Sequence, residues 1–289
     1  MKIVKILGGL GNQMFQFSLA LSLHNKYPEE TVKMDTSCFR YYPLHNGYEL
    51  SKIFGVSMDS ASMTDLIKVA YPYFNYRLWQ IGSRIMPKRR SMLTQLFDIE
   101  FEPLVFDKNI SYFDGYWQSE KYFKDIRPII LNSFKFRPFA DVQNINLLKE
   151  LNKHTTVSVH IRRGDYLKIP MYRDICTLDY YRNAVQYIKS MVQIDKFIIF
   201  SNDIDWCLKN SEHIFGRSNF IIVDWNHKEN SFKDMQLMSL CTHNIVANSS
   251  FSWWGAWLNN NPTKIVIAPH KWTNGNLNMD TIPENWIKI

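Results

Sequence analysis

Short runs of β-forming residues alternate along the chain with longer stretches in which apolar residues recur at helical spacing. Lys2–Leu7 is a β-rich run that stops at glycines, Asn12–Asn25 has a helical pattern, and Thr31–Met34 predicts a second strand that ends at Asp35. A strand, a glycine loop, a helix and a strand in this order are typical of the start of a Rossmann-like domain.

The remainder of the first half is less regular. Residues 50–100 have a mostly helical pattern, Tyr112–Trp117 predicts another strand, and helical signals continue through Lys135. Phe136–Asp141 carries a proline and predicts a linker between domains.

A second series of strands and helices begins near Thr155. Its five predicted strands are Thr156–Ile161, Lys196–Ser201, Asn219–Val223, Asn244–Ala247 and Lys264–Ala268. The helix-like stretches between them are Leu178–Val192, Ile204–Asn210, Lys233–Cys241 and Ser250–Leu258. This alternation predicts a parallel sheet covered on both faces. We therefore expect an α/β protein of two Rossmann-like domains, residues 1–140 and 141–289, that face each other across a cleft.

Composition narrows the choice of partners. The formal net charge is +7 and the pI is about 9.1, which suits an acidic partner such as nucleic acid, anionic lipid or a phosphorylated substrate. There is no long Lys/Arg run, so nucleic acid is not expected. The basic residues 88–90 follow an aromatic stretch; a solvated helix end is favoured there over contact with an anionic membrane surface.

The four cysteines lie far apart and have no metal-type spacing, which favours a reduced, cytoplasmic chain. No run of about 18 apolar residues predicts a transmembrane helix. The N-terminus has no small-residue cleavage site and is interpreted as a first strand.

The first candidate site is the sequence GGLGNQ, which follows the first predicted strand. Glycines at a strand-to-helix turn let backbone N–H groups approach a phosphate. Asp35 even stands where a dinucleotide fold places its ribose acid, but Met14 replaces the third glycine, so a nicotinamide or flavin site is disfavoured. The amides of Asn12 and Gln13 suit the hydroxyls of a sugar.

The sequence HIRRGDY ends the strand Thr156–Ile161 and predicts an anion site. If the strand continues, Arg162 and Arg163 point to opposite sides, and one of them faces the ligand. A guanidinium can grip a diphosphate through two hydrogen bonds. Asp165 is expected to orient that arginine or bind a hydroxyl; a purely structural ion pair is the alternative.

Two further stretches follow predicted strands. Asp203 and Asp205 form a D-x-D pattern, but no third ligand is evident, so no metal site is predicted and Asp203 is interpreted as a helix cap. Asn248, Ser249 and Ser250 precede an aromatic helix whose N-terminus can hold a pyrophosphate without metal. The tryptophans 253 and 257 share one face of this helix and are predicted to be core residues.

Five motifs together resemble the α-1,2-fucosyltransferases of glycosyltransferase family 11. They are GGLGNQMFQF, GYWQSEKYF, HIRRGDY, FSND and DMQLMSLC with NSSFSWWGAWLN, and they span nearly the whole chain. The resemblance implies a GT-B fold, an N-terminal acceptor domain with a helical insertion, a C-terminal GDP-sugar domain, and transfer of L-fucose from GDP-β-L-fucose with inversion. It implies no metal and no other cofactor, and the missing membrane anchor implies a bacterial cytoplasmic enzyme.

The resemblance also implies roles for individual residues. Arg162 matches the arginine on the donor diphosphate, His160 the motif histidine near the nucleotide, and Asp234 the aspartate that binds the guanine edge. Together with the motif analysis, it gives as catalytic candidates Arg162, His160, Asp165 and Asn12. The donor-binding candidates are Arg162, Asp234, Ser249, Ser250, Phe251, Gly9, Gly11 and Asn202.

The general base and the acceptor stay open at this point. The candidates for the base are Asp35, His45, Asp114, Glu120 and Asp165. The implied acceptor is the 2-OH of a terminal β-galactoside in an O-antigen or related glycan, with a lipid-linked acceptor and peripheral contact at the inner membrane face as its extension. The alternatives are another GDP-sugar, another linkage position, or a carbohydrate-binding protein without turnover.

Overall fold

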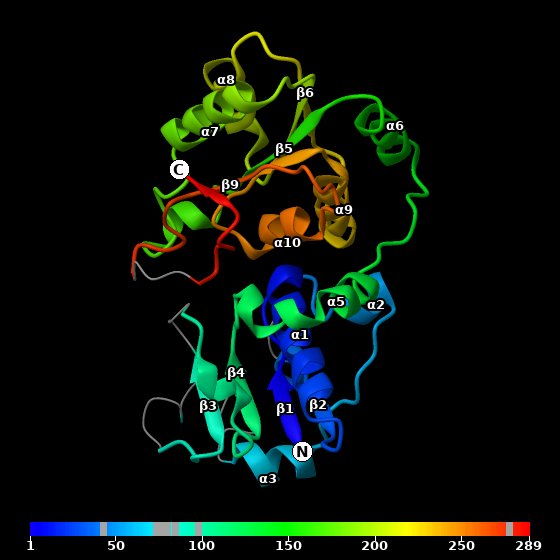
Figure 1. Ribbon diagram of the computed structural model, residues 1–289, viewed down its shortest axis with the longest axis vertical. Helices are drawn as coiled ribbons and strands as arrows, with labels where there is room; N and C mark the ends of the chain where they lie inside the picture. Colours follow the sequence, from blue (N-terminus) through cyan, green and yellow to red (C-terminus); the bar gives the residue numbers. More distant parts are fainter. Residues whose placement is uncertain (41–44, 72–81, 83–86, 96–99, 276–279) are drawn as a thin grey trace. The chain divides into compact units, whose positions relative to one another are not determined.

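The computed structural model describes residues 1–40, 45–71, 82, 87–95, 100–275 and 280–289 (Figure 1). The chain divides into two compact units, Met1–Arg137 and Pro138–Ile289. This division falls within the segment Phe136–Asp141 that the sequence predicts as a linker. Most of the aromatic stretch that precedes the basic residues 88–90 lies outside the described residues.

The first unit contains a parallel sheet of four strands in the order β2-β1-β4-β3. The strands are β1 (Lys2–Lys5), β2 (Val32–Asp35), β3 (Met92–Gln95) and β4 (Tyr112–Gly115). The helices are α1 (Leu10–Lys26), α2 (Leu50–Phe54), α3 (Met63–Ala70) and α5 (Arg127–Ser133), with 3-10 turns at Ser37–Arg40, Pro103–Phe106, Glu120–Tyr122 and Lys124–Ile126. The first strand is buried along its whole length, because it lies between β2 and β4 with α1 packed against it.

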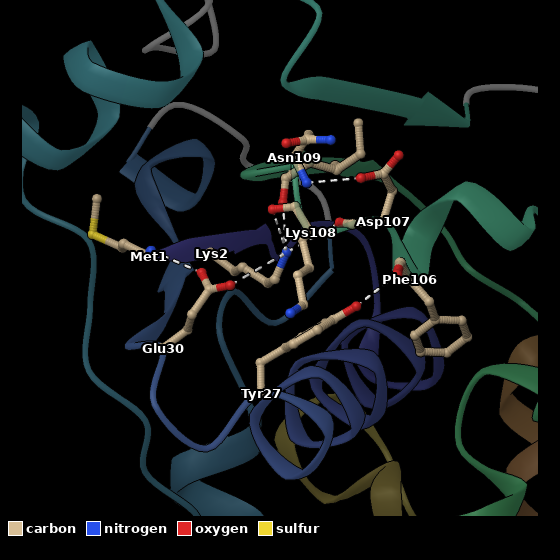
Figure 2. Close-up of polar contacts among 9 residues, drawn as sticks. Met1, Lys2, Tyr27, Glu30, Phe106, Asp107, Lys108 and Asn109 are labelled. Atoms are coloured by element: carbon tan, nitrogen blue, oxygen red, sulfur yellow. Dashed lines mark hydrogen bonds and ion pairs between the residues drawn. The ribbon is translucent and has the colours of Figure 1, made fainter.

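Lys2 shows how this unit buries a charge inside a strand. Its side chain is fully buried, and Nζ donates to the carbonyl oxygens of Ile110 at 2.8 Å and Asp107 at 3.2 Å (Figure 2). The Tyr27 ring lies 4.6 Å from the same nitrogen. Burial lowers the pKa of Lys2, while Glu30 and Asp107 act in the opposite direction. These contacts fix β1 to the segment that leads into β4.

The second unit contains a parallel sheet of six strands in the order β10-β9-β8-β5-β6-β7. The strands are β5 (Thr156–Ile161), β6 (Lys196–Ser201), β7 (Phe220–Val223), β8 (His243–Ile245), β9 (Val266–Ala268) and β10 (Ile287–Lys288). The helices are α6 (Val142–Leu151), α7 (Leu178–Met191), α8 (Ile204–Phe215), α9 (Phe232–Leu240) and α10 (Ser250–Leu258), with 3-10 turns at Tyr166–Lys168 and Lys228–Asn230.

Alternation along the strands explains why both faces of this sheet are covered. Val157, Val159 and Ile161 of β5 pack in one cluster with residues of α7 and α8. Ile198 and Phe200 of β6 pack in another with residues of α6 and α9. Successive strand residues point to opposite faces, so two apolar faces need two layers of helix. The predicted α/β class with two Rossmann-like domains, the components of a GT-B-like fold, is confirmed.

Most predicted elements are confirmed, with four corrections. The region 50–100 is not only helical, because Met92–Gln95 forms the edge strand β3. The predicted linker leads directly into α6, a helix that the pattern did not predict, and β10 was also not predicted. The helix that starts at Ile204 continues to Phe215, because Ile214 and Phe215 are buried against the sheet.

Candidate functional site

The order of strands places one crevice in the second unit. β5 pairs with β6, the next strand along the chain, on one side and with β8 on the other, so the direction of winding reverses between β5 and β8. Ligands of open parallel sheets bind at this reversal, beyond the carboxyl ends of the strands. The segments that leave these two ends are Arg162–Tyr166 and Val246–Ser250.

Arg162 lies at this position and is held on two sides. Its Nη2 donates to Asp165 Oδ2 at 2.8 Å, and its guanidinium lies 5.2 Å from the centre of the Tyr166 ring. Within the described residues, the buried Nε finds no acceptor. The ion pair is partly exposed, with 28% of the Arg162 and 49% of the Asp165 side chain accessible, so it contributes little stability. A diphosphate can therefore compete for the guanidinium.

Arg163 corrects one expectation from the sequence. β5 ends at Ile161, so the alternation of a strand does not extend to the two arginines, and both line the same pocket. Arg163 pairs with Asp203 at 3.4 Å and stacks on Trp206, 4.4 Å from the ring centre. The sequence motif therefore supplies two guanidiniums to one pocket, with separate carboxylate partners.

Asn202 joins the ends of β5 and β6. Its Oδ1 accepts from the backbone N of Arg163 at 2.9 Å, and its Nδ2 donates to Asp165 Oδ1 at 3.2 Å. A Cβ added to Gly164 would lie 2.4 Å from that nitrogen, so a larger residue here would have to displace the Asn202 amide. Asn202, which is predicted to bind the donor, thus also supports the loop that carries the two arginines.

His160 points to the opposite face of β5 from Val159 and Ile161. Its ring is 5% exposed and lies 5.9 Å from the Phe251 ring of α10. Burial, followed by the nearby Arg162 charge, lowers the pKa of His160 to about 3. The imidazole is therefore neutral at physiological pH, and its buried Nδ1 has no hydrogen-bond partner among the described residues.

The N-terminus of α10 forms the other wall of the crevice. Ser249 caps this helix by accepting from the backbone N of Phe251 at 3.3 Å, and Ser250 is its first residue. Burial raises the pKa of the Tyr166 hydroxyl to about 12, despite the nearby Arg162 and a hydrogen bond with Ser249. Tyr166 therefore touches both Arg162 and the cap of α10. An anion here meets a guanidinium and the positive end of a helix.

A pocket of about 250 Å³ opens beside these residues, lined by Arg162, Arg163, Tyr166, Arg173 and Asn248 among others. Asn248 does not cap α10 as the sequence suggested; its Nδ2 donates to the carbonyl oxygens of Tyr172 and Trp272. The pocket is rich in guanidinium groups and suits a phosphorylated ligand.

Asp234 lies in the first turn of α9 and accepts a hydrogen bond on Oδ1 from Asn226 Nδ2 at 2.8 Å. Burial raises the pKa of Asp234 to about 7, and the Asn226 hydrogen bond opposes this. Near neutral pH the side chain is thus close to half protonated.

The tryptophans at positions 253 and 257 of α10, which the sequence predicts as core residues, are 0% and 2% exposed, so this prediction is confirmed.

The glycine loop of the first unit also lies at a reversal of strand order, between β1 and β4. Asn12 accepts from Gln118 Nε2 at 2.7 Å, which joins the segments that follow these two strands. Gln13 corrects an expectation: it is fully buried and donates to the carbonyl oxygens of Gly8 and Gly47, so its amide is not available to a sugar.

Gly9 and Gly11 belong to the start of α1. Gly9 is the N-cap residue of that helix, and Gly11 is buried in its first turn. The ring of His45 lies over Gly9, with Nδ1 3.3 Å from where a Cβ would be. His45 is exposed and has a left-handed backbone, with φ of 62°.

Three of the other candidates for the general base are less accessible than His45, whereas Asp165 of the arginine motif is also exposed. Asp35 is 3% exposed and accepts from the Tyr112 hydroxyl at 2.7 Å. Asp114 is fully buried and pairs with Lys5 at 3.1 Å. Glu120 opens a 3-10 turn. Among the five candidates, His45 combines exposure with a position at the glycine loop.

Asp203 is confirmed as a helix cap, since it accepts from the backbone N of Trp206 at 3.1 Å. It also pairs with Arg163, so two contacts already occupy this carboxylate. In the part of the chain that the structure describes, no three His, Cys, Asp or Glu side chains are grouped to hold a metal ion.

The sequence model of glycosyl transferase family 11 matches residues 85–289, most of the chain and the whole of the second unit. The chain belongs to this family of glycosyltransferases. It is 35% identical to an alpha-1,2-colitosyltransferase of Escherichia coli, over 99% of this chain and 98% of the relative. It is 30% identical to the O-antigen biosynthesis glycosyltransferase WbnK of Escherichia coli, over 98% of each chain. It is also 25% identical to the galactoside alpha-(1,2)-fucosyltransferase 1 of Lagothrix lagotricha, over 50% of this chain and 42% of that protein.

None of the helices described here combines the length and the hydropathy needed to cross a membrane. The structure also adds residues to the site that the motifs did not single out. Tyr166 connects Arg162 to the cap of α10, and Asn226 donates a hydrogen bond to Asp234. Tyr166 could have been predicted as a site residue because it is the last residue of HIRRGDY, whereas no signal in the sequence pointed to Asn226.

Proposed function

We propose that this family 11 glycosyltransferase transfers L-fucose from GDP-β-L-fucose to the 2-OH of a terminal β-galactoside, with inversion, in the synthesis of an O-antigen or related glycan. The observation that carries the proposal is the pairing of Arg162 with the N-terminus of α10 through Tyr166. Both groups stabilise negative charge, and they meet where the sheet reverses its winding. The motif resemblance supplies the donor and the linkage.

The main barrier in such a transfer is the charge that builds on the departing diphosphate. The acceptor hydroxyl attacks the anomeric carbon on the face opposite the nucleotide and gives its proton to a general base, the bond to the diphosphate breaks, and a β-linked donor gives an α-linked product. Arg162 offers the N–H groups that Asp165 does not use, and α10 offers backbone N–H groups of its first turn. We propose that these groups suffice without a metal ion.

The colitosyltransferase among the relatives favours a second candidate donor, GDP-colitose. Colitose lacks the 3-hydroxyl of fucose, so the two donors differ by one polar group. A site built to hydrogen-bond that hydroxyl rejects the deoxy sugar by a large factor, whereas an apolar site discriminates weakly. The ratio of kcat/KM for the two donors therefore separates the candidates.

The test is an incubation of the purified protein with each GDP-sugar and lactose, followed by linkage analysis of the product by NMR. The expected product carries an α-linked 6-deoxy sugar on the 2-position of galactose. A β-linked product, or substitution at another position, would overturn the proposal. A preference for GDP-colitose would keep the linkage and replace the donor.

A further inference from the structure

The first turns of α6 and α9 are joined by a buried chain of side-chain amides. Asn144 of α6 is fully buried, and its Nδ2 donates to Asn226 Oδ1 at 2.8 Å. Asn144 Oδ1 accepts from Trp225 Nε1 at 2.9 Å and from Asn226 Nδ2 at 3.1 Å. The chain ends on Asp234, which accepts from Asn226. A residue of α6 is thus connected, through Asn226, to the carboxyl group of Asp234 in α9.

The direction of each hydrogen bond fixes the orientation of the next amide. Asn144 and Asn226 exchange two hydrogen bonds, and this pairing leaves the second N–H of Asn226 to donate to Asp234. Asn226 is 8% exposed, so little of its side chain is open to water. The rotation of the Asp234 carboxyl is therefore limited by a residue of α6.

Only one oxygen of Asp234 is used in this way. Among the described residues, Asp234 Oδ2 accepts no hydrogen bond, and Oδ1 retains one lone-pair direction. A carboxylate held by one edge presents its other edge to two neighbouring donors. The N1–H and 2-amino groups of guanine form such a pair.

We propose that Asn226 and Asn144 are positioning residues that hold Asp234 for recognition of the guanine edge, so that nucleotide selectivity depends on a side chain of α6. The inference rests on the proposed function, which assigns Asp234 to guanine. A bidentate contact needs both carboxylate oxygens in the plane of the base, and a freely rotating carboxyl would lose affinity in being ordered. The substitution of Asn226 should therefore weaken the recognition of guanine more than the binding of the diphosphate.

A second contact keeps α6 and α9 together when the amide chain is cut. Lys233 pairs with Asp141, the N-cap residue of α6, at 2.9 Å. This ion pair does not involve Asn226 or Asn144, so the substitution Asn226→Ala is expected to act locally. The substitution Asn146→Ala is a matched control, since Asn146 is an exposed residue of the same helix.

The experiment measures the Kd of GDP and of IDP by calorimetry for each variant. IDP keeps N1–H but lacks the 2-amino group, so the ratio of the two constants reports the contact with that group. The wild type and Asn146→Ala should share one ratio in favour of GDP. Asn226→Ala and Asn144→Ala should reduce it about tenfold, which is the size of one hydrogen bond to a charged group.

The outcomes separate the inference from the function on which it rests. If Asp234→Ala lowers the ratio and Asn226→Ala weakens GDP and IDP equally, the amide chain is only structural and the inference fails. If Asp234→Ala leaves the ratio unchanged, the assignment of Asp234 to guanine fails. Should Asn226→Ala lower the melting temperature strongly, Asn226→Asp keeps the shape and places a carboxylate against Asp234; a wild-type ratio in that variant would also overturn the inference.

Discussion

Asp234 ties donor binding to pH. Burial raises its pKa from the ordinary value of 3.8 to about 7, while a carboxylate that accepts from guanine must be ionised. About one-tenth of the side chains are ionised at pH 6 and about nine-tenths at pH 8, so the affinity for GDP should rise about tenfold between these pH values.

Calorimetry of GDP binding from pH 5.5 to 8.5 measures this change. The terminal phosphate of GDP titrates near pH 6 itself, at about the pKa of a phosphate monoester. The variant Asp234→Asn removes the carboxyl titration and keeps the phosphate titration, so the difference between the two curves belongs to Asp234. Parallel curves for the wild type and the variant would refute the reasoning.

The variant Asp234→Asn also tests whether burial raises the pKa of Asp234, through the pH dependence of the melting temperature. Because folding raises the pKa of Asp234, the protonated form is favoured in the folded state, and stability is lost as the pH rises from about 4 through 7. At pH 8 the loss is at most about 4 kcal/mol. Asp234→Asn should therefore melt at a higher temperature than the wild type at pH 8 and at a similar temperature at pH 4.

Three further predictions concern the two loops. Arg162→Ala should lower kcat about a hundredfold or more without affecting the fold, because it removes charge stabilisation from the leaving diphosphate. Near-normal turnover of this variant would exclude Arg162 from the mechanism. Full activity of the wild type in EDTA would agree with a mechanism that needs no metal ion. Gly164→Ala should displace Asn202 and lower the donor affinity, and the effect should largely disappear in an Asn202→Ala background. His45→Gln should lower kcat at saturating donor about a hundredfold, whereas the exposed His24→Gln should leave it unchanged; near-normal turnover of His45→Gln would exclude His45 as the base.

Most strands and helices of the fold could be predicted from local patterns of apolar and polar residues along the chain. The strand Thr156–Ile161 and the helix Ser250–Leu258 were predicted with the bounds that the structure has, because each has a strong apolar period and an abrupt polar end. The short strand β3 and the helix α6 were missed. In α6 only Asn144, Leu147 and Leu151 are buried, which is too narrow a stripe to distinguish a helix from a linker.

Some site residues could likewise be predicted from the sequence and others could not, and the difference has a physical cause. Arg162 and Asp165 are three residues apart, so a motif can show their pairing. Asn144 and Asn226 are separated by 82 residues and meet because α6 packs beside the segment that leads into α9. The groups expected to contact the diphosphate thus lie close together in the sequence and can be predicted from short motifs. The groups that set the geometry and the pKa of Asp234 come from packing, and a single sequence does not reveal which distant amide will lie against a given carboxyl.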